Sequence, residues 1–242
     1  MEQFQILEWD TGFFGMTVAR ILPHRLIQEE LERTIALLRK GGVSLAYWAS
    51  DPADEGSQQA ALACGGLLAD RKVTYLAELG DIPEPVGGSG WMVEEFEDSA
   101  PGDDLEDLAV QAGCCSRFKV DEGIPVDKFV DLYKLWIRNS VNKRIAEAVF
   151  VIRRENRIVG MVTVGDKGGR GDIGLVAVDG RMRGKNIGAA LVHAAGKWAY
   201  AKGFIHMQVV TQGGNLAACA LYEKCGYRIE KVENLYHFWI LK

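Results

Sequence analysis

The sequence contains little cysteine, with five in 242 residues, and no two of them form a C-x-x-C pair. An odd number of thiols without that spacing suggests neither a disulfide framework nor a structural zinc site. The four histidines show no ligand spacing either, so we expect no metal. Free thiols are typical of a reducing compartment, and we expect a cytoplasmic protein.

Long hydrophobic runs are also missing, since no 18 consecutive residues are apolar. We therefore expect neither a membrane span nor a secretion signal. The formal net charge of −5 gives no strong field of either sign. This argues against nucleic acid as the main partner, although a local basic patch could still hold a small phosphate ligand. With 48% hydrophobic and 25% charged residues, the composition is that of a globular protein with a real core.

Residues 83–90 read Pro-Glu-Pro-Val-Gly-Gly-Ser-Gly and predict a break between two domains. Two prolines stop a helix, and the small residues provide a flexible connector. We predict a smaller N-terminal α/β domain over 1–86, a linker over 87–90 and a second domain over 91–242.

Hydrophobic periodicity predicts alternating helices and strands on both sides of this break. In the first domain we expect strands at 4–9, 16–22, 43–48 and 67–79 and helices at 26–40 and 54–66. In the second we expect helices at 103–113, 126–140, 186–202 and 215–225, and strands at 91–96, 147–154, 157–165, 171–179, 204–211, 227–232 and 235–241.

The most informative stretch runs from Leu175 to Leu191 and predicts a strand, a tight basic loop and an amphipathic helix. Small residues at the start of a helix leave its first backbone N–H groups uncovered, and these bind phosphate oxygens with help from the helix dipole. The loop has neither the G-x-x-x-x-G-K-[ST] of a P-loop nor the G-x-G-x-x-G of a dinucleotide fold. It predicts another kind of pyrophosphate site. The alternative is a basic surface turn that caps the helix.

Arg183-x-x-Asn186-x-Gly188 resembles the acetyl-CoA loop of the Gcn5-related N-acetyltransferase (GNAT) superfamily, whose form is [QR]-x-x-G-x-[GA]. Asn replaces the first glycine and is the non-glycine residue that best tolerates a left-handed backbone. The resemblance implies an α/β (α+β) fold with a mixed central sheet flanked by helices, and acetyl-CoA as cosubstrate. It also implies that a bulged strand holds the thioester through backbone N–H groups. The implied cofactor-binding residues are Leu175, Val176, Ala177, Val178, Arg183, Gly184, Lys185, Asn186, Ile187, Gly188 and Ala189.

A second stretch, Asn215 to Tyr227, is similar to the superfamily pattern N-x-x-A-x-x-[LF]-Y-x-x-x-G-[FY]. Offsets of three and seven place Asn215, Ala218 and Tyr222 on one helical face. The resemblance implies that Asn215 binds the pantetheine arm, that Ala218 lets the arm pass and that Tyr222 faces the CoA sulfur. A phenol is suited to protonate a departing thiolate, so Tyr222 is the expected catalytic acid. The alternative is an amphipathic helix with a core tyrosine, ended by Gly226.

Shorter segments outside these motifs resemble the dTDP-fucosamine acetyltransferases, which acetylate the 4-amino group of dTDP-4-amino-4,6-dideoxygalactose for surface polysaccharides. These segments are residues 7–15, 116–119, 198–203 and 210–215. The likeness implies a nucleotide-linked amino sugar as acceptor. Arg117, Phe118 and Lys119 are the expected substrate-binding residues, because a guanidinium can hold a diphosphate and a ring can cover a sugar face. A solvated charged loop is the alternative.

The expected reaction is direct attack of the sugar amine on the thioester, without an acyl-enzyme. The base is Glu147, Asp172 or a water chain, and the sequence does not choose among them. Two other functions stay open: transfer to another small amine or a protein N-terminus, and a non-catalytic acetyl-CoA sensor, against which Tyr222 argues. A homodimer is open as well.

Overall fold

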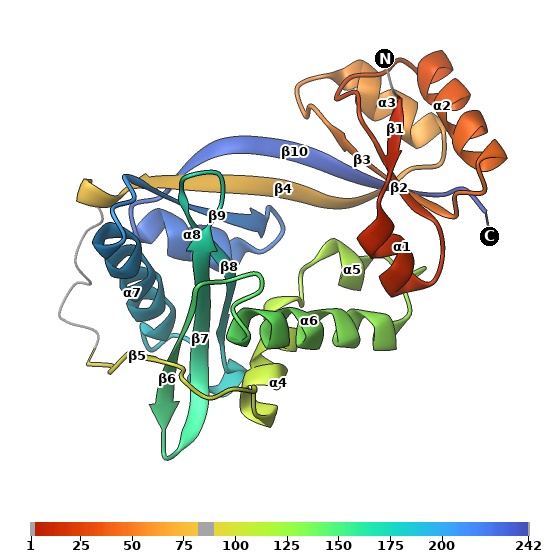
Figure 1. The fold of residues 1–242 in the computed structure, drawn as a ribbon. Helices are drawn as coiled ribbons and strands as arrows, with labels where there is room; N and C mark the ends of the chain where they lie inside the picture. Colours follow the sequence, from red (N-terminus) through yellow and green to blue (C-terminus); the bar gives the residue numbers. More distant parts are fainter. Residues whose placement is uncertain (1–2, 82–89, 242) are drawn as a thin grey trace. The chain divides into compact units, whose positions relative to one another are not determined.

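The computed structural model describes residues 3–81 and 90–241 and divides them into two compact units (Figure 1). Unit 1 comprises 3–72, 116–123 and 232–241, and unit 2 comprises 73–81, 90–115 and 124–231. The predicted connector lies outside the described residues, except for Gly90, so the division into 1–86, 87–90 and 91–242 stays a prediction. The observed division differs because β4 (Leu67–Glu78) and β10 (Arg228–Trp239) each contribute residues to both units.

Unit 1 is a small α/β unit with the strand order β1-β2-β3-β10-β4. Strands β1 and β2 are antiparallel, β2 and β3 are parallel because a helix crosses over between them, and β3 and β10 are antiparallel. Its other elements are β1 (Phe4–Ile6), α1 (Glu8–Phe14), β2 (Val18–Ile21), α2 (Gln28–Lys40), β3 (Leu45–Ser50), α3 (Glu55–Ala63) and α5 (Arg117–Val120).

The core of unit 1 forms where one face of α2 meets the strands. Leu31 and Leu38 are fully buried and lie seven residues apart on that face, together with Ile35. They share a hydrophobic cluster with Trp48 of β3, whose indole N–H donates to the carbonyl of Pro23 at 2.6 Å. The buried indole is therefore paired, which fixes its orientation in the core.

Unit 2 contains a mixed sheet flanked by helices, as the GNAT resemblance implies. Its strand order is β10-β4-β9-β8-β7-β6-β5; β5 to β8 pair antiparallel, and β8 and β9 pair parallel. The elements are β5 (Glu94–Glu95), α4 (Asp103–Ala112), α6 (Val126–Val141), β6 (Ala148–Arg154), β7 (Arg157–Asp166), β8 (Gly171–Val178), α7 (Ile187–Ala201), β9 (His206–Gln212) and α8 (Leu216–Lys224), with the short 3-10 turns Leu79–Asp81 and Gly180–Met182.

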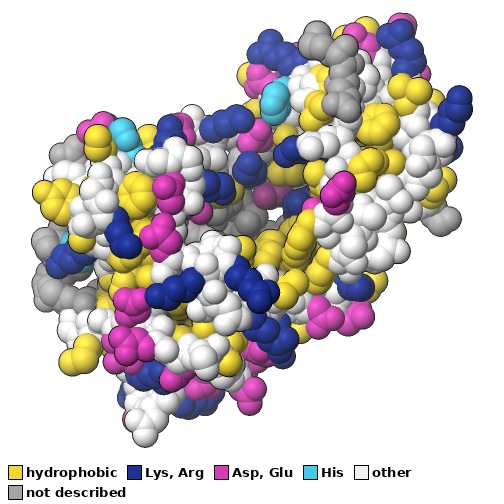
Figure 2. Space-filling view, in the orientation of Figure 1, with side chains coloured by type: hydrophobic (Ala, Val, Ile, Leu, Met, Phe, Trp, Pro, Cys, Tyr) yellow, Lys and Arg dark blue, Asp and Glu magenta, His cyan; other side chains and the backbone are white. Residues whose placement is uncertain are grey.

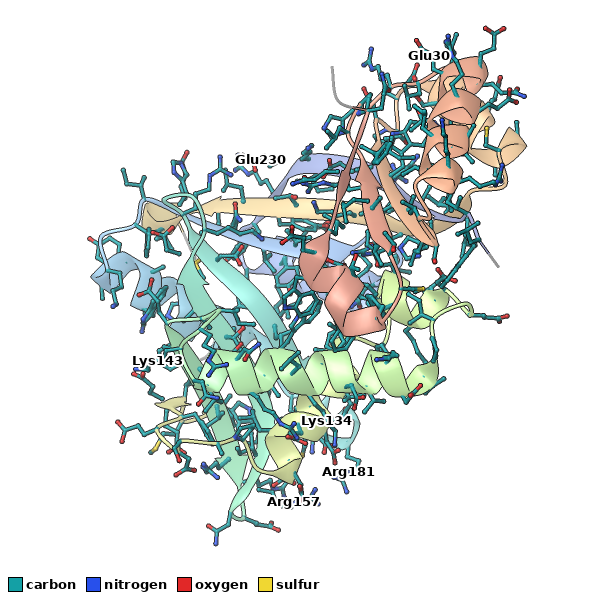
Figure 3. The ribbon with its side chains drawn as sticks, turned by 45° about the vertical axis from the view of Figure 1, so that its right-hand side comes forward. Glu30, Lys134, Lys143, Arg157, Arg181 and Glu230 are labelled. Carbon is teal, nitrogen blue, oxygen red and sulfur yellow. The ribbon has the colours of Figure 1, made fainter. Side chains whose placement is uncertain are left out.

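Helices α4 and α6 pack on each other through an ion-pair cluster. Glu106 of α4 meets the Lys134 ammonium at 3.1 Å and the Arg138 guanidinium at 2.6 Å, both from α6. Lys134 is labelled in Figure 3. Glu106 is 8% exposed, so its charge needs these partners. The two cations, which the sequence presents as ordinary helix surface, join two helices of unit 2.

Two sequence expectations fail, each for a local reason. The strand expected at 4–9 ends at Ile6, because residues 8–14 form α1, which ends at Gly15 in a left-handed conformation. The two strands expected at 227–232 and 235–241 are one strand, β10. Glu233 and Asn234, which lie between the two expected strands, are both buried within β10, and Glu233 pairs with the Lys72 ammonium at 3.1 Å.

The described ranges hold no helix long and apolar enough to cross a bilayer, and no cluster of three His, Cys, Asp or Glu side chains suited to a metal ion. On the face drawn in Figure 2, basic and acidic side chains are interspersed. Neither sign forms a continuous field there, in keeping with the near-balanced charge of the chain.

Candidate active site

Strand β8 is bulged where the thioester site is expected. The register to β7 shifts between Val162 and Val164, and the Leu175 N–H donates to the Thr163 hydroxyl at 2.9 Å. A glycine is needed beside it, because a Cβ on Gly174 would lie 2.8 Å from the same hydroxyl oxygen. The bulge interrupts the ladder at residues 174 and 175, and pairing with β7 resumes at Val176.

The same strand parts from β9 at this point. Parallel pairing joins Gly171–Ile173 to Met207–Val209, and the described residues beyond Ile173 show no further register pair between the two strands. Residues 176–178 pair with β7 on one edge only. Their other edge offers backbone N–H and C=O groups that a bound chain could pair with.

The loop before α7 has the backbone that the sequence predicts. Asn186 is left-handed, with φ 59° and ψ 13°. This confirms the prediction that Asn can take the left-handed backbone of the glycine it replaces in the motif. Gly184 is also left-handed, with φ 76°. Helix α7 begins at Ile187, and its first N–H groups have no partner within the helix. The loop therefore presents the donor set that binds phosphate oxygens.

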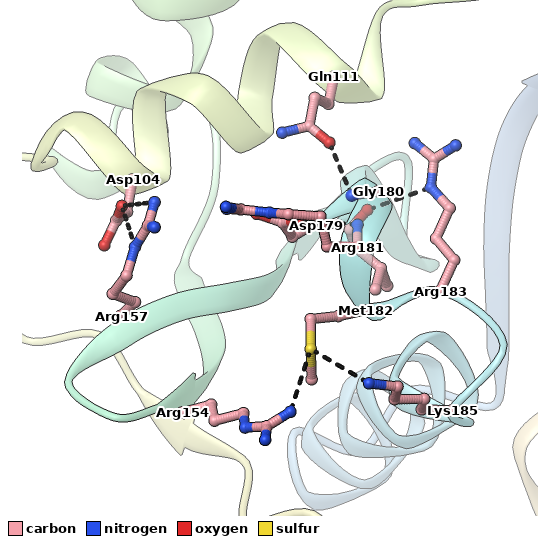
Figure 4. Close-up of polar contacts among 11 residues, drawn as sticks. Asp104, Gln111, Arg154, Arg157, Asp179, Gly180, Arg181, Met182, Arg183 and Lys185 are labelled. Carbon is pink, nitrogen blue, oxygen red and sulfur yellow. Dashed lines mark hydrogen bonds and ion pairs between the residues drawn. The ribbon is translucent and has the colours of Figure 1, made fainter.

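Basic side chains surround this loop (Figure 4). The Arg183 Nε–H donates to the Val178 carbonyl at 3.3 Å. Lys185 and Arg154 both reach the Met182 sulfur, at 3.6 and 3.5 Å. These contacts place three cations around the turn that leads into α7.

The neighbouring Arg181 is neutralised and differs from the other cations. Its guanidinium meets Asp179 at 2.8 Å, and this hydrogen bond holds the pKa of Asp179 well below its usual range. Lys224 of α8 was missed by sequence reasoning, and its ammonium lies 3.4 Å from the Asn186 side-chain oxygen. The available signal was its place two residues after Tyr222 in the second motif.

Asn215 acts first as the N-cap of α8. Its side-chain oxygen accepts the Ala218 N–H at 3.2 Å. The amide NH₂ group of Asn215 is not needed for the cap, so it keeps two donors for a ligand. Ala218 is half-buried on the first turn. Asn215 therefore fixes the N-terminal end of α8 and precedes the helix, whereas Ala218 lies within it.

Tyr222 is 5% exposed and lies among other tyrosines. Its ring centroid is 5.8 Å from that of Tyr75 and 6.0 Å from that of Tyr227. Burial raises the pKa of Tyr222, so the phenol keeps its proton at neutral pH. Tyr75, which sequence reasoning missed, donates its hydroxyl to Glu223 at 2.8 Å and so ties β4 to α8 beside Tyr222.

The two candidate bases differ in their surroundings. The Asp172 side chain is 17% exposed, accepts a hydrogen bond from the Gln208 amide at 2.8 Å and lies 3.9 Å from the Lys167 ammonium. Burial raises the pKa of Asp172 and outweighs the hydrogen bond. The Glu147 side chain is 44% exposed and pairs with the Lys202 ammonium at 3.4 Å. Asp172, two residues before the bulge, has the environment of a proton acceptor.

The predicted substrate residues lie in unit 1, on α5. Phe118 is 7% exposed and stacks on Phe14 with ring centroids 5.9 Å apart. It packs in the core of unit 1, so the expectation that its ring covers a sugar face is not supported by its position. Arg117 is half-buried with its guanidinium 3.9 Å from the centroid of the Tyr47 ring, and Lys119 is exposed. Arg117 is thus no solvated side chain.

Gly188 is held by packing between α7 and α8. A Cβ there would lie 3.0 Å from a methyl carbon of Leu221. We expect Gly188→Val to lower the free energy of unfolding by about 1–3 kcal/mol through overpacking. Urea unfolding measures this change. Adding Leu221→Ala should recover part of the loss, and a single variant as stable as the wild type would contradict this packing.

Comparison with known proteins decides what the site belongs to. Residues 124–227 match the model of the acetyltransferase (GNAT) family. Residues 124–227 are a GNAT-family domain, and the chain is an N-acetyltransferase. This enzyme is 28% identical over 241 residues to the dTDP-fucosamine acetyltransferase of Escherichia coli O6:H1, covering 98% of this chain and 96% of that protein.

Solved structures share the fold of this enzyme. A GCN5-related N-acetyltransferase from Sphaerobacter thermophilus matches with a TM-score of 0.64 and 17% identity, over 99% of this chain and 76% of that one. A GCN5-related N-acetyltransferase from Kribbella flavida matches with a TM-score of 0.60 and 14% identity, over 91% and 80%. Both likenesses extend beyond residues 124–227.

Proposed function

We propose that this enzyme transfers the acetyl group of acetyl-CoA to the amino group of a nucleotide-linked amino sugar of the dTDP-4-amino-4,6-dideoxygalactose type. The observation that carries the acceptor is the extent of the likeness to the E. coli dTDP-fucosamine acetyltransferase, which covers 98% of the chain. The match to the family model covers only residues 124–227. Unit 1, which lies mostly outside that range, is therefore shared with a relative named for a nucleotide sugar.

The cofactor side of the proposal rests on the α7 loop and on β8. Backbone N–H groups of Ile187, Gly188 and Ala189 would bind the pyrophosphate of acetyl-CoA, with Arg183, Lys185 and Lys224 supplying positive charge. The open edge of residues 175–178 and the amide of Asn215 would pair with the pantetheine arm. Acetyl-CoA would supply the thioester that the amine attacks.

The chemistry needs one acid and one base from the protein. The sugar amine forms the new C–N bond as the C–S bond breaks, and the sulfur leaves with the electron pair of that bond. Tyr222 would give this sulfur a proton, and its burial, which raises the pKa of the phenol, supports that role. Asp172 accepts a proton from the amine. Backbone N–H groups of the bulge would stabilise the charge on the carbonyl oxygen.

A thiol-release assay with acetyl-CoA and a panel of amines tests the acceptor. The panel contains dTDP-4-amino-4,6-dideoxygalactose, the same sugar without nucleotide, a polyamine, an aminoglycoside and a peptide with a free N-terminus. We expect the highest kcat/KM for the nucleotide sugar. A higher value for any other amine would refute this acceptor while leaving the acetyltransferase in place.

Arg117→Ala is expected to raise KM for the nucleotide sugar by roughly 10- to 150-fold, the loss of one charge-assisted hydrogen bond. The KM for acetyl-CoA should stay unchanged, because the proposed pyrophosphate site lies at residues 183–189 of unit 2. Lys40→Ala, which removes an exposed cation at the end of α2 in the same unit, is the control. An equal loss with the free amino sugar would mean that Arg117 does not hold the diphosphate.

A further inference from the structure

Unit 1 contains a buried carboxylate with a full set of hydrogen-bond donors. Asp121 is 2% exposed and accepts from the His237 ring at 2.6 Å, from the Gly123 N–H at 2.9 Å and from the Trp239 indole at 3.1 Å. Burial alone would raise the pKa of Asp121, but these hydrogen bonds outweigh it and hold the pKa below its usual value. Asp121 is therefore a buried anion that fixes the groups around it.

The His237 ring joins this carboxylate to Arg117. His237 is fully buried, with Nδ1 against Asp121 and Nε2 at 3.0 Å from an Arg117 nitrogen. A guanidinium can only donate, so Nε2 accepts and Nδ1 carries the proton that goes to Asp121. Burial lowers the pKa of His237, in agreement with a neutral ring. The chain of donors runs in one direction, from Arg117 through His237 to Asp121.

The guanidinium of Arg117 is also fixed by rings. It lies 3.9 Å from the Tyr47 ring centroid and 4.3 Å from that of Phe118. The bond to His237 uses one of its five N–H groups. The Tyr47 hydroxyl is buried and interacts with Arg117, but it makes no hydrogen bond of good geometry within the described residues. A half-buried cation with spare donors thus lies beside a hydroxyl that lacks a well-formed hydrogen bond, the arrangement of a site that can take a polar ligand.

Charge alone does not explain such a site. Asp10 and Asp70 both act electrostatically on Arg117, so its positive charge is partly compensated. An anion that binds here depends on the direction of the guanidinium N–H groups more than on net charge. The fixed orientation of Arg117 is then the property that matters for affinity.

We propose that Asp121 and His237 are positioning residues that orient Arg117 and, with the Tyr47 hydroxyl, build a binding site for the diphosphate of the acceptor. This inference rests on the proposed nucleotide-sugar acceptor. Neither positioning residue touches the ligand, and both act through the guanidinium. The competing interpretation is a structural clamp that only fastens residues 116–123 within unit 1.

Three variants separate positioning from clamping. His237→Leu removes the acceptor for Arg117, whereas His237→Gln keeps a donor and an acceptor on one side chain. Trp239→Phe is the matched control, since it removes one donor to Asp121 without touching Arg117. If the cluster is only a clamp, Trp239→Phe and His237→Leu should weaken ligand binding to the same degree. If Asp121 and His237 position Arg117, only His237→Leu should weaken ligand binding.

Calorimetric titration of the full chain with thymidine diphosphate measures the effect. We expect His237→Leu to raise its Kd at least about tenfold, the loss of a charge-assisted contact, while Kd for acetyl-CoA stays within twofold. His237→Gln should stay within about threefold of the wild type, and Trp239→Phe should lower Tm without changing Kd. Equal losses of affinity for thymidine diphosphate in His237→Leu and Trp239→Phe, or no loss of affinity in His237→Leu, would overturn the proposal.

A second measurement covers the case in which His237→Leu does not fold. Nitrogen-15 NMR of the wild-type histidine rings should show Nδ1 protonated in His237, with an Nε2 shift that changes when thymidine diphosphate is added. An unchanged shift overturns the proposal, as does a wild-type chain that does not bind thymidine diphosphate. The panel of amines tests the acceptor separately. If His237→Leu acetylates the nucleotide sugar as well as the wild type does, the positioning proposal fails but the proposed function stands.

Discussion

Tyr222→Phe is expected to lower kcat by about 10²- to 10⁴-fold, the range for losing a general acid, with no change in Kd for acetyl-CoA. The ring of Tyr222 is buried against Tyr75 and Tyr227, and phenylalanine fills the same space. Only the hydroxyl group is removed, and with it the proton that could be transferred. Because burial raises the pKa of Tyr222, wild-type kcat should hold to a higher pH than an ordinary phenol with a pKa of about 10 would allow.

Tyr227→Phe is the control for this variant. Its hydroxyl is buried without a hydrogen-bond partner in the described part of the chain, and its ring lies 6.0 Å from that of Tyr222. We expect its kcat within about threefold of the wild type, because no proton donor to the sulfur is lost. Stopped-flow thiol release at saturating acetyl-CoA measures both variants. Equal kcat values for Tyr222→Phe and Tyr227→Phe would remove Tyr222 from the chemistry.

The sequence carries most of the information about the cofactor side of the site. Arg183, Asn186 and Gly188 form a local pattern, and local backbone geometry is what short motifs encode. The left-handed Asn186 followed from residue chemistry alone. Tyr75 and Lys224 could not be found in this way, because their roles depend on β4 and α8 lying beside the motif residues in space.

Unit 1 was harder to predict, for two reasons. Helix α1 has only seven residues, one of them a glycine, so its periodicity is too short to distinguish from a strand. The basic segment at 117–119 was expected to be a ligand-binding loop, but Phe118 is a core residue and Arg117 is bound to His237, 120 positions later in the chain. No local pattern encodes a contact across that separation.

Asp172→Asn is expected to lower kcat/KM at pH 7 by about 10²- to 10⁴-fold, the range for losing a general base. Asn keeps an oxygen that can accept the Gln208 amide, so the link between β8 and β9 survives. What disappears is a carboxylate that takes a proton. Glu147→Gln is the matched control, since the Glu147 side chain is 44% exposed and pairs with Lys202; its loss should be within about threefold.

The pH profile provides the sharper test of Asp172. A base works in its ionised form, so activity falls as the pH drops through its pKa. Burial raises the pKa of Asp172, and the acid limb of kcat/KM should therefore lie above the usual Asp value of about 3.9. Asp172→Asn should abolish that limb, whereas Glu147→Gln should leave it in place. If the limb moves with Glu147→Gln and stays in Asp172→Asn, the base is Glu147, and Asp172 serves only to hold Gln208 of β9 beside the bulged strand.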